Sequence, residues 1–242
     1  MRPVRKGPPY LYTDGQAYGK ALAGLAARLG LYCSYCERPL QHGAEVEHIQ
    51  PKSIPAHKPL ECRWSNFLLS CKNCNASKST KDPALAEWLI PDRDNTAAAF
   101  VYRKDGVIDI APTITPTQNA AAAKTLDMLK LNRKVRKTFD QQGNLVALDR
   151  RNQRLDAWLL ADRYAGKLAK NPSADLADAI ADLAKTSGFF SIWLAAFETV
   201  PSFRQKLIAA FTGTESACFD TITTLPTPTH PNSDGLSAGG KL

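Results

Sequence analysis

Two cysteine pairs, Cys33-Ser34-Tyr35-Cys36 and Cys71-Lys72-Asn73-Cys74, frame the stretch of sequence that decides the fold. Each pair can present two thiolates to one tetrahedral ion, and four sulfur ligands together satisfy structural zinc. Such a site leaves no open position for a reacting water, so we expect this metal to stabilise the fold and do no chemistry. The alternative is a set of redox-active or merely buried cysteines. The 34 residues between the pairs exceed the spacing of a plain zinc ribbon, which indicates an insert with its own role.

The insert holds Glu45-Val46-Glu47-His48-Ile49-Gln50-Pro51-Lys52-Ser53, followed by Asn66 and, directly after the second cysteine pair, by Asn75. This arrangement resembles the HNH, or ββα-metal, nuclease family, in which an acidic residue and His end a strand, an Asn follows in a loop, and a last Asn or His lies on a helix. The resemblance covers about residues 31–81. It implies an endonuclease that hydrolyses phosphodiester bonds with the help of a metal ion. The catalytic residues that it implies are His48, Glu47, Asn66 and Asn75.

The chemistry explains why these residue types are needed, because phosphodiester hydrolysis requires an activated water, a nearby cation and stabilisation of the departing oxygen. His48 is the natural general base, since an imidazole with a pKa near 6.5 is largely neutral at cellular pH. We expect Glu47 and Asn75 to supply oxygen ligands to Mg²⁺ or another divalent cation. Glu45, on the same strand face as Glu47, is a competing ligand. By resemblance, Asn66 braces the loop and orients His48.

Basic residues outnumber acidic ones by 31 to 23, a net charge of +8 that favours polyanionic partners. Between residues 130 and 154, eight basic residues stand against two acidic ones, which indicates either a phosphate track or a solvated helix face. Lys78 lies one turn beyond Asn75 if that segment is helical, so it could face the same phosphate. The nucleic-acid contacts that we predict are Lys52, Lys78, Arg133, Lys134 and Arg136.

A narrower resemblance rests on MRPVRKGPPY (1–10), YCSYCERPL (32–40), VEHIQPKS (46–53) and NFLLSCKNCNASKSTKD (66–82). These strings are similar to the PtuB-like HNH proteins, the nuclease component of Septu-type anti-phage systems and of some retron systems. The resemblance implies a PtuA-like partner ATPase of the ABC or RecF type that restrains the nuclease. DNA is the favoured substrate. An RNA nuclease with the same site, acting for example on transfer RNA, and a non-catalytic zinc-knuckle module that binds nucleic acid remain alternatives.

Local patterns predict an α+β fold with a mostly α-helical C-terminal region, and the HNH resemblance implies a small ββα-metal module around the four-cysteine zinc site. β-branched and aromatic runs on both sides of Asp105-Gly106 are a hairpin signal. Apolar periodicity predicts helices near 118–140, 145–171, 174–186 and 188–212. The predicted segments are an N-terminal arm and helix (1–30), the HNH module (31–95), a β-hairpin (96–112), a helical region (113–224) and a disordered tail rich in Pro, Gly, Ser and Thr (225–242).

The sequence also indicates where the protein works. The charged N-terminus is followed by no apolar run of the kind that a secretory signal needs, and no stretch approaches the length of a membrane-spanning helix. In a reducing cytosol, CxxC pairs are more often metal ligands or redox centres than structural disulfides. We therefore expect a cytoplasmic protein with no membrane partner.

Overall fold

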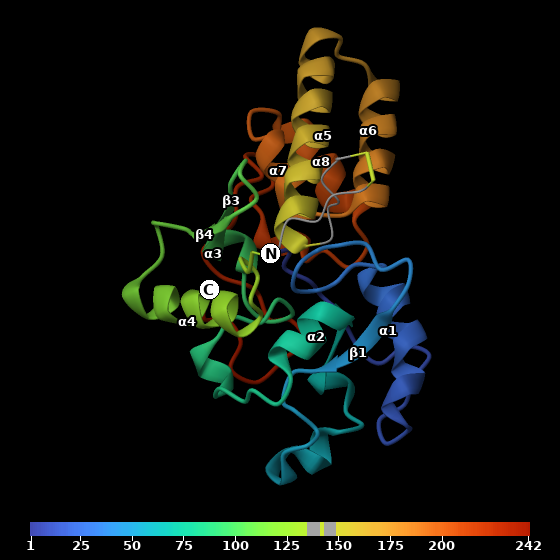
Figure 1. Cartoon of the computed structure of the whole chain (residues 1–242), viewed down its shortest axis with the longest axis vertical. Helices are drawn as coiled ribbons and strands as arrows, with labels where there is room; N and C mark the ends of the chain where they lie inside the picture. The colour runs from blue at the N-terminus through green and yellow to red at the C-terminus, as the bar shows by residue number, and fades with distance from the viewer. Residues whose placement is uncertain (135–140, 143–148) are drawn as a thin grey trace.

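The computed structural model describes residues 1–134, 141–142 and 149–242, and its fold is α+β, as predicted. Figure 1 shows two neighbouring parts, a small ββα unit with α1 beside it and a group of helices, α5 to α8. The helices are α1 (Ala21–Leu29), α2 (Lys72–Lys78), α3 (Thr96–Ala99), α4 (Pro116–Met128), α5 (Arg150–Lys170), α6 (Ala174–Ser187), α7 (Phe190–Ala196) and α8 (Pro201–Ala210), and the strands are β1 (Ala44–His48), β2 (Phe67–Cys71), β3 (Phe100–Tyr102) and β4 (Ile108–Ile110).

The ββα unit consists of β1, β2 and α2. The two strands pair antiparallel, with His48 opposite Phe67 and Ala44 opposite Cys71. Helix α2 begins directly after β2, because Cys71 acts as its N-cap and its sulfur accepts a hydrogen bond from the backbone N–H of Cys74. Both α1 and α2 contact the two strands. Strand β2 is buried along its whole length, so this unit has a core of its own.

Between β1 and β2 the chain forms a long loop that contains the short 3-10 helices Pro55–Leu60 and Trp64–Asn66. A second antiparallel ribbon joins β3 and β4 around Asp105-Gly106, and Gly106 has a φ of 77°. Such a backbone conformation favours glycine, which has no Cβ to clash. The segment just before this ribbon, which we predicted to belong to the hairpin, forms helix α3.

Helices α5, α6, α7 and α8 form one group, in which α7 contacts each of the other three and both its aromatic residues, Phe190 and Trp193, are buried. One predicted helix, near 188–212, is instead two. Pro201 is the first residue of α8, and a proline disfavours helical backbone in the residue before it. The chain therefore turns between α7 and α8. Within the described residues, no helix combines the length and the apolar character that crossing a membrane requires.

The C-terminal segment differs from the predicted disordered tail, because it packs against the turn at residues 92–95. The backbone N–H of Asn95 and that of His230 both donate to the carbonyl of Leu242, which is 2% exposed. The Lys241 ammonium lies 2.8 Å from the carboxylate of Asp94. The prediction of disorder rested on composition, which indicates only how much apolar surface the segment can bury by itself. In the structure, residues 93–95 form hydrogen bonds with the backbone of the segment and so hold it in place.

Candidate active site and metal centre

The four paired cysteines come together in one buried cluster. All four Sγ atoms lie within 4.8 Å of one another, and those of Cys36 and Cys71 are 3.7 Å apart. A zinc ion with Zn–S bonds of about 2.3 Å needs sulfur atoms about 3.8 Å apart, so the donor set fits tetrahedral zinc. Each of these cysteines is at most 4% exposed. A closed site of four thiolates suits a structural ion and offers no position for substrate.

Arg150, the first residue of α5, ties the helical region to this cluster. One guanidinium nitrogen lies 3.1 Å from the sulfur of Cys74 and donates to the carbonyl of Leu129, and the other terminal nitrogen donates to the carbonyl of Lys130. Burial opposes the charge of Arg150, but the neighbouring cysteine sulfurs outweigh it and raise the pKa of the guanidinium. Arg150 belongs to the basic run between residues 130 and 154, yet its guanidinium contacts the cysteine cluster and does not lie free in solution.

Two acidic residues of β1 face α2, as expected for residues two apart on a strand. The amide nitrogen of Asn75 donates to Oε2 of Glu45 at 2.6 Å. Both residues are partly exposed. A carboxylate and a side-chain amide are oxygen donors of the kind that hard divalent cations bind. This pair is therefore the accessible oxygen site on this face of the module.

Glu47, the predicted ion ligand, is instead paired with Lys78. Both side chains are about 1% exposed, and the ammonium lies 3.1 Å from Oε1 of Glu47. Burial raises the pKa of Glu47 to about 7, although the charge of Lys78 opposes the rise. Lys78 also donates to the backbone carbonyl of His48 at 2.7 Å.

Lys78, which we predicted to contact the phosphate, is buried. Asn75 and Lys78 are one turn apart on α2, so both face β1, where Glu45 and Glu47 lie on one side of the strand. A lysine with its ammonium buried between a carboxylate and a carbonyl does not present that charge to a phosphate in solution.

His48 ends β1 and lies against a different set of residues. Its Nε2 is 2.9 Å from the backbone carbonyl of Glu61, and its ring contacts those of Tyr18 and Phe67, with centroids 4.9 and 5.2 Å away. A carbonyl only accepts, so Nε2 carries the proton and Nδ1 keeps its lone pair. Burial lowers the pKa of His48 below its usual 6.5. The imidazole is therefore neutral, and able to accept a proton, at neutral pH.

Lys52 lies beside this histidine. Its ammonium is 3.8 Å from the centroid of the Tyr18 ring, a cation–π contact, and its charge contributes to the lowered pKa of His48. The Lys52 side chain is partly exposed. Of the predicted nucleic-acid contacts, Lys52 is a partly exposed residue beside the His48 ring, whereas Lys78 is buried under the backbone of His48.

Asn66 connects the two ends of the loop that surrounds His48. Its side-chain oxygen accepts from the backbone N–H of Gln50 at 2.8 Å, and its amide nitrogen donates to the carbonyls of Gln50 and Leu60. The backbone carbonyl of Asn66 accepts from the N–H of Ile49. Leu60 precedes Glu61, whose carbonyl holds the His48 ring. Asn66 thus ties together the segments before and after this contact.

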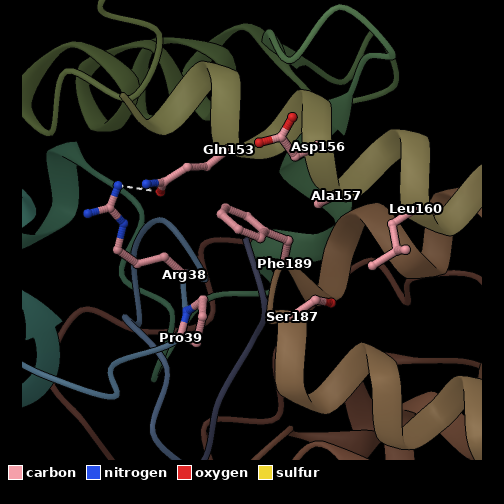
Figure 2. Close-up of a pocket in the computed structure, with 8 residues that line it drawn as sticks. All are labelled: Arg38, Pro39, Gln153, Asp156, Ala157, Leu160, Ser187 and Phe189. Atoms are coloured by element: carbon pink, nitrogen blue, oxygen red, sulfur yellow. Dashed lines mark hydrogen bonds between the residues drawn. The ribbon is translucent and has the colours of Figure 1, made fainter. Parts of the chain in front are cut away.

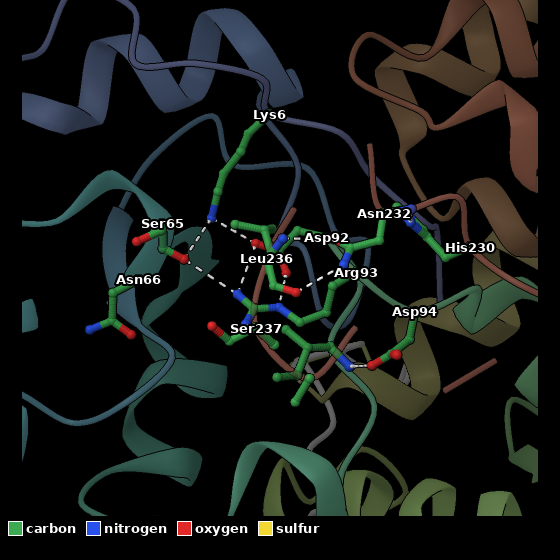
Figure 3. Close-up of polar contacts among 12 residues, drawn as sticks. Lys6, Ser65, Asn66, Asp92, Arg93, Asp94, His230, Asn232, Leu236 and Ser237 are labelled. Carbon is green, nitrogen blue, oxygen red and sulfur yellow. Dashed lines mark hydrogen bonds and ion pairs between the residues drawn. The ribbon is translucent and has the colours of Figure 1, made fainter. Parts of the chain in front are cut away.

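A buried ionic cluster supports the Asn66 segment, and sequence reasoning missed it. Lys6 donates to the carbonyls of Ser65 and Phe67 and forms a 2.6 Å ion pair with Asp92 (Figure 3). Arg93 donates to the carbonyl of Ser65 and pairs with Asp92. The segments that meet here are far apart in the chain, so no local pattern indicates the cluster.

The remaining predicted contacts lie elsewhere. Arg133 and Lys134 are exposed, and Arg136 lies outside the described residues. The predicted residues thus form two sets, His48 with Asn66 and Lys52, and Asn75 with the acidic residues of β1. Within the described part of the chain no hydrogen bond joins the His48 ring to Glu47 or Asn75. Lys78 links the sets through the backbone of His48.

A pocket lies apart from the predicted site residues. It is lined by α5, by the segment that follows the first cysteine pair, and by the connection between α6 and α7. Figure 2 shows Arg38 donating to the side chain of Gln153 at one side of it and the ring of Phe189 facing into it. None of the residues that line this pocket is a predicted site residue. The candidate site is therefore the end of β1 and not this pocket.

Comparisons with known proteins find two similarities. Residues 33–81 match the HNH endonuclease family. Over 131 residues the chain is 30% identical to the Septu protein PtuB of Bacillus thuringiensis, an alignment that covers 51% of this chain and 46% of that protein. The match thus spans about half the length of this relative. Both findings confirm the resemblance predicted from the motifs, and the chain carries an HNH endonuclease domain at residues 33–81.

Proposed function

We propose that this chain is a metal-dependent HNH endonuclease that hydrolyses phosphodiester bonds of nucleic acid, with DNA the favoured substrate. The observation that carries the proposal is the setting of His48. It lies inside the HNH match and is neutral, and its Nε2 is held by a carbonyl, which leaves Nδ1 free to accept a proton.

His48 acts as the general base in this proposal. Its Nδ1 accepts the proton of the attacking water, and the carbonyl of Glu61 stabilises the imidazolium that forms. Lys52 supplies positive charge next to the base and attracts the phosphate. Asn66 acts as a brace, because its hydrogen bonds hold both segments that position the ring.

A divalent cation, most simply Mg²⁺, supplies stabilisation of the departing oxygen when it is bound. Asn75 and Glu45 are the residues that fit it, since one carries an amide oxygen and the other a carboxylate, their side chains are in contact, and both are partly exposed. Glu47 fits less well, because its carboxylate is buried against Lys78. We therefore assign the cation to Glu45 and Asn75. The Glu47–Lys78 pair fixes the end of β1 through the carbonyl of His48.

Exchanging the two carboxylates for amides tests this assignment. We expect Glu45→Gln to weaken Mn²⁺ binding to the zinc-loaded protein by about tenfold or more, since one of few charged ligands is lost. Glu47→Gln should leave it nearly unchanged. Glu87→Gln, at an exposed glutamate paired with Lys124, is the control. Titration calorimetry measures all three. A greater loss in Glu47→Gln would show that the cation displaces Lys78 and binds Glu47.

The similarity to the PtuB-like proteins supports a role in anti-phage defence, under the control of a PtuA-like ATPase of the ABC or RecF type, in the cytoplasm. The coupling of nuclease to ATPase is part of the proposal. The alignment with the Septu protein PtuB, and the anti-phage setting that the motifs imply, support it.

Incubation with two substrates tests the activity. The purified protein, with and without the co-expressed ATPase, is mixed with supercoiled plasmid and with transfer RNA in Mg²⁺. We expect nicked or linear plasmid, and no product when Mg²⁺ is omitted, because the cation stabilises the leaving oxygen. Cleavage of transfer RNA alone would assign the site to RNA. No cleavage of either polymer under any of these conditions would refute the proposed activity.

A further inference from the structure

A polar groove lies between the outer side of α2, the end of α4 and the start of α5, and neither the metal centre nor the base explains it. Asn75 and Lys78 face β1, whereas the α2 residues of the groove lie on other sides of that helix. Apart from one alanine, every side chain that lines the groove is polar or charged. The lining residues are Asn73, Ala76, Ser77, Ser79, Lys81, Lys130, Arg133, Asp149 and Arg150.

The described residues that line the groove carry an excess of positive charge. Lys81, Lys130 and Arg133 are exposed, and none forms an ion pair with a carboxylate of the described residues. Asp149, the acidic residue of the groove, caps α5 and accepts from the backbone N–H groups of residues 151 and 152. Lys81 donates to two backbone carbonyls, those of Ser77 and Met128. A carbonyl has no net charge, so these hydrogen bonds do not neutralise the ammonium.

Exposed basic residues elsewhere on the surface are commonly paired. Lys104 lies 2.7 Å from Asp162, Lys124 pairs with Glu87, and Arg103 lies within 3.3 Å of two aspartates. A carboxylate thus neutralises each of these basic residues. In the groove, by contrast, Lys81, Lys130 and Arg133 pair with no carboxylate of the described residues, which favours a phosphate site over a solvated helix face there.

Lys130 has a left-handed backbone conformation, which lysine rarely adopts. It follows the end of α4 with a φ of 50°, where the backbone N–H groups of residues 130 and 131 close the helix by bonding back to Asp127 and Leu126. Glycine or asparagine is the usual residue in this conformation. Arg150 fixes the backbone by donating to the Lys130 carbonyl at 2.6 Å and connects it to Cys74 of the metal centre.

We propose that this groove binds backbone phosphates of the nucleic acid that flank the scissile phosphate. The inference rests on the proposed function and extends it to the substrate track. Phosphate contacts are made by Lys, Arg, hydroxyl and amide groups, which are the groups found here. A docked protein would need an apolar centre, which the groove lacks. The width of one helix, about 10 Å, separates the groove from Asn75, so the phosphates held there are neighbours of the one being cut.

Binding of a fluorescein-labelled DNA duplex, followed by anisotropy without added Mg²⁺, tests the groove independently of cleavage. The test variant is Lys130→Gly with Arg133→Gln, and the control is Lys104→Gln with Lys124→Gln, which removes the same number of charges. We expect the test variant to bind about tenfold more weakly at moderate salt, and its slope of log K against log salt to fall by about 2. The control should bind almost as the wild type does.

A folding defect does not explain such a loss, because glycine suits the backbone at position 130 and the melting temperature of Lys130→Gly should not fall. Equal weakening of DNA binding in both double variants would overturn the proposed groove, because the loss would then follow from the change in net charge alone. Unchanged binding in the test variant would overturn it as well. If the wild type binds through the groove but cuts no nucleic acid, the proposed nuclease activity fails and the groove stands. If the wild type cuts nucleic acid and the test variant binds DNA as the wild type does, the proposed groove fails and the nuclease activity stands.

Discussion

Replacing Cys71 by Ser is expected to abolish both zinc binding and stable folding. Cys71 is a ligand in the cluster, ends β2 and caps α2, so the ββα unit depends on it at three points. Structural zinc contributes about 10–16 kcal/mol in small zinc-binding peptides, as much as or more than the total stability of a typical domain. Loss of one thiolate should therefore release the ion and unfold the module.

Metal analysis by mass spectrometry and thermal unfolding measure these two effects. Wild-type protein should carry about one zinc ion per chain, and the Cys71→Ser variant should carry little and be poorly soluble. Cys62→Ser is the matched control, since Cys62 is a partly exposed cysteine outside the cluster. Full zinc content and an unchanged melting temperature in Cys71→Ser would rule out the four-cysteine site.

The second large effect is expected from Lys78→Met, which leaves the buried carboxylate of Glu47 without its cation. Removing one partner of a buried ion pair costs about 3–5 kcal/mol. Without Lys78 the pKa of Glu47 rises above its present value of about 7, so the carboxyl is protonated over a wider range.

The direction of the pH dependence follows from this pKa. A carboxyl whose pKa is higher in the folded than in the unfolded state binds its proton more tightly when folded. Its contribution is fully present at low pH and is lost as the pH rises through the folded pKa. Lys78→Met should therefore lose more stability at pH 8 than at pH 5.5. Urea unfolding at both pH values measures the difference.

Two further variants separate this effect from a simple packing defect. Lys78→Met combined with Glu47→Gln should recover part of the stability at pH 8, because no buried charge remains. Lys72→Met, at an exposed lysine on the same helix, should be close to neutral. If Lys78→Met were as stable as Lys72→Met at pH 8, the buried pair would have no energetic role.

Much of the module is predictable from sequence because its signals are local. The CxxC spacing indicates one tetrahedral site, and the resemblance to the HNH family implies that Glu47 and His48 end a strand. The partner of each acidic residue is not a local property. It depends on how α2 lies on β1, which brings Asn75 to Glu45 and Lys78 to Glu47.

The parts that sequence reasoning missed depend on contacts between distant segments. No local pattern in the N-terminal arm indicates a partner for Lys6, yet its ammonium is buried against Asp92. The terminal segment looked disordered from its composition, yet its backbone bonds to residues 93–95. Such contacts satisfy polar groups, so they leave no apolar periodicity in the sequence.

The most direct test of the central claim compares cleavage by the wild type and by His48→Ala, under the conditions in which the wild type cuts. A general base contributes about 10²–10⁴-fold, so we expect the variant to lose cleavage by that factor. Its zinc content and its anisotropy-measured DNA binding should stay unchanged. His42→Ala, at an exposed histidine, should cleave as the wild type does. Cleavage by His48→Ala at the wild-type rate would contradict the assignment of His48 as the base.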